Sequence, residues 1–138
     1  RAVQSKQFNY IFNPWAAGGR KFQAAGQGTL TYQEMIAKAE MDPRTSKLLK
    51  QYDYRVVEEF FDIESDPDNL NNLIDDPKFQ DEIANHRAIL DQWMEKTKDP
   101  VHTAFQNRED LRYLDGFVEA QQAQAFRRRD VERERNLK

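Results

Sequence analysis

Cysteine is missing from this 138-residue sequence, and histidine is scarce, with two residues. Without cysteine the chain can form no disulfide, no thiolate nucleophile and no cysteine-ligated zinc site, and the sequence does not define its redox compartment. His86 and His102 form neither an H-x-x-x-H nor an H-E-x-x-H pair, whereas a zinc site needs three or four converging ligands. No zinc site is predicted, and His86 is interpreted as an ordinary helix-face residue.

A strong charge of one sign and long apolar runs are also missing. The chain has 21 Lys and Arg against 24 Asp and Glu, a formal net charge of −3, so it has no general attraction to nucleic acid or to an anionic membrane. No apolar run approaches the roughly 20 residues that span a bilayer. The sequence begins at Arg1 without Met or a signal-peptide pattern, and we expect it to be an excised piece of a longer protein.

Common nucleotide-binding and hydrolase motifs are absent. The stretch from Gly18 to Lys21 lacks the spacing of a phosphate-binding P-loop, and no G-x-S-x-G nucleophile elbow occurs. Glu58 and Glu59 are adjacent on a predicted strand, so their side chains should face opposite sides and cannot form a glycosidase carboxylate pair.

An acidic stretch that begins at Asp62 resembles a calcium loop only superficially. Counted from Asp62, the sixth and twelfth positions are Pro67 and Leu73, where an EF-hand loop needs Gly and Glu. These carboxylates are expected to cap turns instead. The residues alone therefore indicate an α+β piece without a self-contained active site.

Aromatic and β-branched residues indicate the strands. Phe8, Tyr10 and Phe12 alternate along residues 1–13, which predicts a hairpin with a turn near residues 5–6 and a central second strand. A further strand is predicted over residues 55–63. Asp66-Pro67 should end this strand in a turn, followed by a short helical turn rich in Asn.

Capping residues and apolar spacing indicate the helices. Asp42-Pro43 and Asp76-Pro77 each place a cap before Pro at the first helical position, and Thr31 begins a capping-box pattern with Glu34. The predicted helices cover residues 31–41, 43–49, 77–98 and 108–135, with Asn107 and Asp110 as candidate caps of the last one. The apolar stripe of the third helix consists of Phe79, Ile83, Leu90, Trp93, Met94 and Thr97. The apolar stripe of the fourth helix consists of Leu111, Leu114, Phe117, Val118 and Gln121.

The predicted fold class is α+β. It consists of a small antiparallel sheet of three or four strands, packed by the long amphipathic helix over residues 77–98, with a further C-terminal helix. Residues 101–106 are predicted to be a connector. The charged end of the chain, from residue 127, should be a solvated helix end because it has no apolar face.

The long loop at residues 13–28 is the candidate ligand-binding segment. Its Trp15 and Phe22, together with the adjacent cations Arg20 and Lys21, could line a ligand cleft. The alternative, which the residues favour slightly, is that Trp15 and Phe22 simply pack at the edge of the core.

The order of several motifs resembles the C-terminal subdomain of the formylglycine-dependent sulfatases, closest to the N-sulfoglucosamine sulfohydrolase (heparan N-sulfatase)-like branch. The motifs are Arg1-Ala2-Val3, Phe8 to Asn13, Glu59-Phe60-Phe61-Asp62-Ile63 with Asp66-Pro67 and Asn72-Leu73, Leu90 to Trp93, and Thr97 to Pro100. The resemblance covers residues 1–100, and residues 101–138, the connector and helical tail, carry no motif of this family.

The resemblance implies a longer hydrolase with an alkaline-phosphatase-like catalytic domain upstream. That domain would supply the formylglycine and the calcium ion, so this chain alone should hold neither and should be inactive. Its partners would be this upstream domain and a sulfated carbohydrate such as a glycosaminoglycan, and its role would be to complete the fold and shape the substrate cleft. The resemblance makes the loop over residues 13–22 the candidate for shaping this cleft, where Asn13, Trp15, Arg20 and Phe22 could contact sugar rings or sulfate groups. Relatives of this kind are periplasmic, secreted or lysosomal.

A different class of function stays open. The apolar stripe of the last helix could instead pair with a partner or a second copy, which would make the chain a free-standing interaction module. The opposing interpretation is that this helix folds back on the same sheet.

Overall fold

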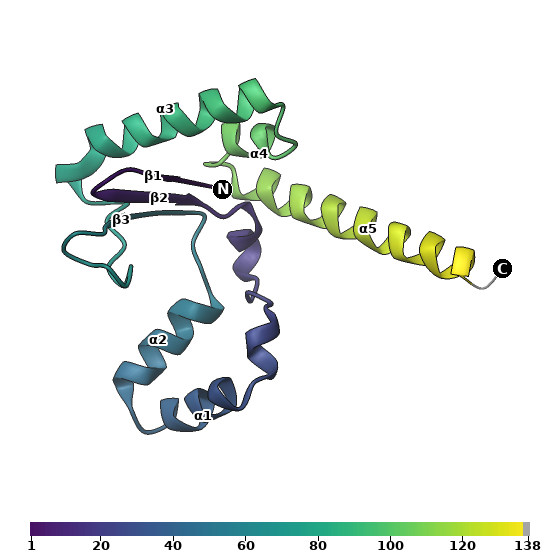
Figure 1. Cartoon of the computed structure of the whole chain (residues 1–138), viewed down its shortest axis with the longest axis horizontal. Coiled ribbons are helices and arrows are strands. Elements are labelled where there is room, and N and C mark those ends of the chain that lie inside the picture. The colour runs from purple at the N-terminus through teal and green to yellow at the C-terminus, as the bar shows by residue number, and fades with distance from the viewer. Residues whose placement is uncertain (137–138) are drawn as a thin grey trace.

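A three-stranded antiparallel sheet lies at the centre of the computed structural model, which describes residues 1–136 (Figure 1). Its strands are β1 (Ala2–Gln4), β2 (Phe8–Phe12) and β3 (Glu58–Asp62), in the order β1-β2-β3. The turn between β1 and β2 is closed by the N–H of Phe8, which donates to Ser5 Oγ at 2.9 Å. The α+β class and the central position of β2 are confirmed, whereas β3 is shorter than residues 55–63.

Helix α3 (Gln80–Thr97) packs across one face of the sheet, as predicted (Figure 1). A short 3₁₀ turn, η3 (Pro77–Phe79), precedes it, and the Asp76 carboxylate accepts the N–H of Lys78 at 2.9 Å. The helix buries Ile83, His86, Leu90 and Met94. Trp93 is 50% exposed, so its predicted place in the apolar stripe is wrong.

Residues 101–106 are not the predicted connector, because residues 102–106 form α4 (His102–Gln106). Phe105 of α4 is buried and meets the ring of Phe12 edge-on, with centroids 5.1 Å apart. This packing stabilises a helix that is too short to be stable alone. The prediction failed because the stabilising contacts come from β2, about ninety residues earlier.

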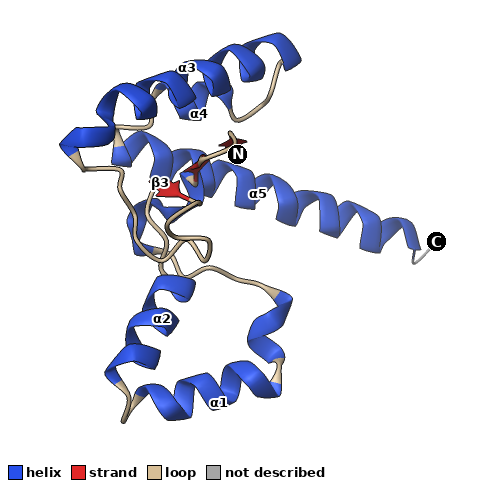
Figure 2. Ribbon diagram, turned by 60° about the vertical axis from the view of Figure 1, so that its left-hand side comes forward, coloured by secondary structure: helices blue, strands red, loops and turns tan. Residues whose placement is uncertain are grey.

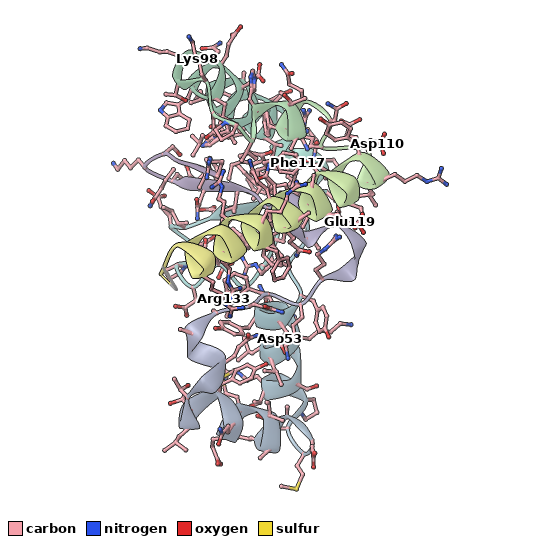
Figure 3. All side chains as sticks on the ribbon, turned by 90° about the vertical axis from the view of Figure 1, so that its right-hand side faces the viewer. Asp53, Lys98, Asp110, Phe117, Glu119 and Arg133 are labelled. Carbon is pink, nitrogen blue, oxygen red and sulfur yellow. The ribbon has the colours of Figure 1, made fainter. Side chains whose placement is uncertain are left out.

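The last helix, α5 (Leu111–Asn136), begins later than predicted. Asp110 caps it by accepting the N–H groups of Arg112 and Tyr113, both at 3.0 Å, so Asn107 is not the cap (Figure 3). Leu114 and Val118 are buried, but Leu111 is 58% exposed. The helix packs against α4 and the loop after β2 through its first turns, and then extends away from the sheet (Figure 1).

A long excursion separates β2 from β3 and forms a second lobe (Figure 2). It contains η1 (Pro14–Gly19), η2 (Ala25–Gly28), α1 (Leu30–Ala39) and α2 (Pro43–Asp53). The cap of α1 is Thr29, whose Oγ1 accepts the N–H of Tyr32 at 3.3 Å, so the predicted capping box at Thr31 is wrong. Asp42 caps α2 through the N–H groups of Arg44 and Thr45, as predicted.

Residues 63–76 form a series of turns, and the short helical turn predicted there does not form. The Asp66 carboxylate accepts the N–H of Asn71 at 2.8 Å, and Asn69 adopts a left-handed conformation with φ of 54°. Asn72 Oδ1 accepts the N–H of Phe60 at 2.9 Å, which attaches this corner to the outer edge of β3. The Asp-Pro corner is therefore a structural feature, as its spacing indicates.

Among residues 1–136, no helix combines the length and the apolar character that crossing a lipid bilayer requires.

Candidate functional site

Trp15 and Phe22 form an aromatic pair at the start of the excursion. Their ring centroids lie 5.2 Å apart, and both side chains are partly buried. Phe22 also meets Tyr52 of α2 edge-on at 6.0 Å, and Tyr52 lies 5.9 Å from Tyr32 of α1. These rings form a second small core that holds the second lobe together, which agrees with the packing interpretation of Trp15 and Phe22.

The same pair also lines an open hollow, which we call the α5 hollow because α5 forms one of its walls. Its volume is about 420 Å³. The residues that line it are Trp15, Arg20, Lys21, Phe22, Gln23, Val118 and Gln122. Three of the four candidate residues, Trp15, Arg20 and Phe22, are therefore brought together.

Both cations of the α5 hollow already have acidic partners. Arg20 forms an ion pair with Asp115 of α5 and donates to the carbonyl of Ala17 at 2.6 Å. Lys21 Nζ lies 2.9 Å from the carboxylate of Asp53. Because these charges are compensated, the hollow mainly offers aromatic faces and the amide groups of two glutamines. Such surfaces suit the apolar faces and hydroxyl groups of a sugar ring.

Asn13 lies on the other side of the aromatic pair and does not join Arg20. Its amide donates to Glu59 at 2.8 Å and to the carbonyl of Val56 at 3.1 Å. Here a smaller hollow of about 290 Å³ is lined by Ile11, Asn13, Trp15, Phe22, Tyr52, Arg55 and Glu59. Asn13 therefore joins the two ends of the excursion, and the aromatic pair contributes to both hollows.

Asp53 is the buried anchor of the second lobe (Figure 3). Its side chain accepts hydrogen bonds from the Tyr32 hydroxyl at 2.7 Å and from Gln27 at 3.2 Å, in addition to the Lys21 contact. Burial alone would raise the pKa of Asp53, but the hydrogen bonds from Lys21, Tyr32 and Gln27 outweigh it and lower the pKa. Asp53 is thus held as a carboxylate that positions the Lys21 side of the α5 hollow.

Glu58 and Glu59 face opposite sides of β3, as the sequence predicts. Glu59 accepts hydrogen bonds from Asn13 and Arg55. Glu58 accepts a hydrogen bond from the Tyr10 hydroxyl at 2.6 Å and two from the guanidinium group of Arg87. Burial, followed by the charge of Glu58, raises the pKa of Tyr10. The two carboxylates cannot act together on one substrate.

Cation-binding clusters are not found: over the part of the chain that the structure describes, no three His, Asp or Glu side chains converge. His86 is buried in the core against Phe8 and Phe60, and its Nδ1 lies 2.9 Å from the carbonyl of Glu82. His102 lies 2.8 Å from Asp91. The residues present do not make a calcium site of the kind that the sulfatase resemblance assigns to the upstream domain.

Sequence reasoning missed Asp115, Val118 and Gln122, the α5 contributions to the site. The signal that could have found two of them is the spacing of Leu114, Val118 and Gln122, which places them on one face of a helix. The spacing does not reveal that this face meets the loop after β2. The contact joins residues about one hundred positions apart, and it shows that the first turns of α5 pack against the loop after β2.

Comparisons with known proteins support the sulfatase resemblance over part of the chain. No family model matches. The chain is 33% identical over 96 residues to an ulvan-active sulfatase of Formosa agariphila, an alignment that covers 68% of this chain and 16% of that protein. It is 43% identical over 42 residues to a Delta 4,5-hexuronate-2-O-sulfatase of Bacteroides thetaiotaomicron, which covers 30% of this chain and 9% of that protein.

The chain thus spans about a sixth or less of the length of these relatives. Neither relative is named as an N-sulfoglucosamine sulfohydrolase, so that finer assignment remains a prediction. Over about two thirds of its length, the chain is similar in sequence to a sulfatase.

Proposed function

We propose that the chain is a non-catalytic C-terminal part of a sulfatase, which completes the fold of the longer enzyme and shapes its substrate cleft. The observation that carries the proposal is the α5 hollow, where Trp15 and Phe22 lie beside the amides of Gln23 and Gln122. The similarity to sulfatases supports a sulfated saccharide as the substrate class of this hollow. The aromatic rings would support the sugar ring, and the amides would bind its hydroxyl or sulfate oxygens.

The chemistry would belong to the rest of the enzyme. A formylglycine and a calcium ion supplied by the upstream domain would provide the nucleophile and stabilise the charge on the sulfate oxygens. The residues of this chain would bind and orient the saccharide at the edge of the cleft. The expected compartments remain the periplasm, the extracellular space or the lysosome.

The test uses the longer enzyme that contains this chain, with a sulfated oligosaccharide and a small aryl sulfate as substrates. Trp15→Ala should lower kcat/KM for the oligosaccharide about tenfold, a loss of roughly 1.4 kcal/mol in transition-state stabilisation. The aryl sulfate, which lacks the saccharide units that the hollow would bind, should react as before. Trp93→Ala is the matched control, because Trp93 is exposed on α3 and does not line the hollow.

Equal loss for both substrates would contradict a role in saccharide binding and would point to a general folding defect. Sulfatase activity in the 138-residue chain alone would contradict the proposal that it is non-catalytic.

The interaction module is the second candidate, and the burial of Leu114 and Val118 speaks against it. Both residues lie on the apolar stripe expected to pair and are packed within the chain, although Leu111 of the same stripe is 58% exposed. A concentration-dependent dimer in sedimentation experiments would favour pairing, and a monomer at all concentrations would exclude pairing between copies.

A further inference from the structure

A third hollow lies between α3 and α4, away from the α5 hollow. Its volume is about 420 Å³, and it is lined by Arg87, Ala88, Asp91, Phe105, Gln106 and Arg108. Two arginines from separate segments therefore meet at one open surface. The lining also includes one carboxylate, Asp91, whose Oδ1 lies 2.8 Å from Nε2 of His102.

The two arginines share one partly buried acidic partner, Glu58. Arg87 takes the better position, with its Nε and Nη2 donating to the two carboxylate oxygens at 2.8 and 3.0 Å. The Tyr10 hydroxyl donates to the same carboxylate at 2.6 Å. These three short hydrogen bonds leave little acceptor capacity for a second guanidinium group.

Arg108 is the cation that lacks a full partner. Its Nε is 3.4 Å from Glu58 and buried, and it makes no hydrogen bond to any residue that the structure describes. Its other contacts are weak: Nη1 donates to the carbonyl of Phe105 at 3.3 Å, and Nη2 is 3.8 Å from Glu109, a largely exposed side chain. The Phe105 ring supports the guanidinium group, at 5.1 Å from its central carbon.

We propose that this hollow binds an oxyanion, a sulfate or carboxylate group, through Arg108 with Arg87 and Gln106 beside it. The charge of Arg108 is incompletely compensated, because Glu58 is already bonded to Arg87 and Tyr10, and Asp91 lies against His102. A planar guanidinium fork matches the oxygens of sulfate and carboxylate. The Gln106 amide adds neutral donors. This site is independent of the proposed function, because its residues are separate from those of the α5 hollow and it can be tested in the 138-residue chain.

The test follows the arginine Nε–H resonances of the ¹⁵N-labelled chain by NMR while sulfate replaces chloride at constant ionic strength. The expected result is a saturable shift of Arg108, with a smaller shift of Arg87. Acetate in a parallel titration identifies whether the site prefers a planar carboxylate. Saturable binding of either anion supports the site, and saturable binding of neither overturns it.

Variants then assign the binding to Arg108. Arg108→Gln should lower the affinity for the anion at least tenfold. Arg108→Lys, which keeps the charge but loses the planar guanidinium fork, should lower the affinity less. Arg112→Gln is the matched control, because it removes the same charge from an exposed position on α5. An equal loss in Arg112→Gln, or unchanged binding in both Arg108 variants, would overturn the proposal.

Discussion

Asp53 is a single carboxylate that joins three segments of the second lobe. Lys21 and Gln27 come from the long loop, Tyr32 comes from α1, and Asp53 itself ends α2. A nearly buried carboxylate is costly unless it is paired and hydrogen-bonded, and here it is both. Its charged form is therefore part of the stability of the lobe.

Replacing Asp53 with Asn should destabilise the protein by about 1–3 kcal/mol at pH 7, because hydrogen bonds to a buried charge are lost. The pKa of Asp53 is lowered on folding, so its contribution is present above the ordinary value of 3.8 and is lost as the pH falls below it. Urea unfolding of both proteins should therefore differ most at neutral pH and converge in acid. Asp75→Asn, at an exposed position, is the control and should change little at either pH.

Gly18 supports the contact between the loop and α5. Its φ is +73°, and a Cβ atom there would lie 2.7 Å from Asp115 Oδ1 and 2.8 Å from Arg20 Nη1. Gly18→Ala should therefore destabilise the protein by roughly 1–2 kcal/mol, because alanine is strained in the left-handed conformation. It should also disturb the ion pair between Arg20 and Asp115.

Gly19→Ala is the matched control for Gly18. Its φ is +66°, but a Cβ atom there meets nothing within 4 Å, so the substitution incurs the backbone cost alone. Thermal unfolding should rank Gly18→Ala as slightly less stable than Gly19→Ala, because the crowding atoms are the ends of two flexible side chains that can move at the cost of their ion pair. A Gly19→Ala variant that is less stable than Gly18→Ala would contradict this crowding.

At the scale of elements, the structure and the sequence pattern place the cap of α1 at different residues, Thr29 and Thr31. Thr29→Ala should destabilise α1 by about 1 kcal/mol, since its hydroxyl accepts the Tyr32 N–H. Thr31→Ala, which the capping-box pattern would predict to be harmful, should be neutral because Thr31 lies inside the helix and is exposed. Hydrogen exchange of the α1 amides measures both effects, and the reverse order would place the cap at Thr31.

The sequence predicted elements whose causes are local. In Asp42-Pro43 and Asp76-Pro77, the Asp side chain and the Pro ring favour a helix start through residues next to them in the sequence. The alternation of Phe8, Tyr10 and Phe12 likewise indicates a strand. Prediction from the sequence failed where contacts with residues distant in the chain determine whether an element forms. Helix α4 depends on Phe105 reaching β2.

The residues of the candidate site also fall into those that local sequence could predict and those that depend on distant contacts. Trp15, Arg20 and Phe22 are close in the sequence, so their grouping could be predicted from one loop. Asn13 belongs to the same loop, but its amide turns toward Glu59 and away from the α5 hollow. The contributions of Asp115 and Gln122 depend on how α5 packs, which no local pattern specifies.

At the scale of the whole molecule, α5 has two parts with different roles. Removing residues 121–138 should leave the fold and its thermal stability nearly unchanged, because residues 121–129 are exposed. Removing residues 107–138 also deletes Leu114 and Val118 and should cost several kcal/mol, at about 1.5–3 kcal/mol for each buried apolar side chain. Circular dichroism and thermal unfolding of the two truncated chains test this difference. Similar melting temperatures would show that α5 contributes little to the core.

The excursion between β2 and β3 also has a consequence for the order of folding. These strands are neighbours in the sheet, and the N–H of Asn13 donates to the carbonyl of Val57 at 2.8 Å where the excursion leaves and returns. Pairing the strands therefore requires closing a long flexible segment, whose entropy cost rises with its length. If α1 and α2 associate early, they shorten the segment that remains flexible. The lobe that carries the aromatic pair would then set the rate at which the central sheet forms.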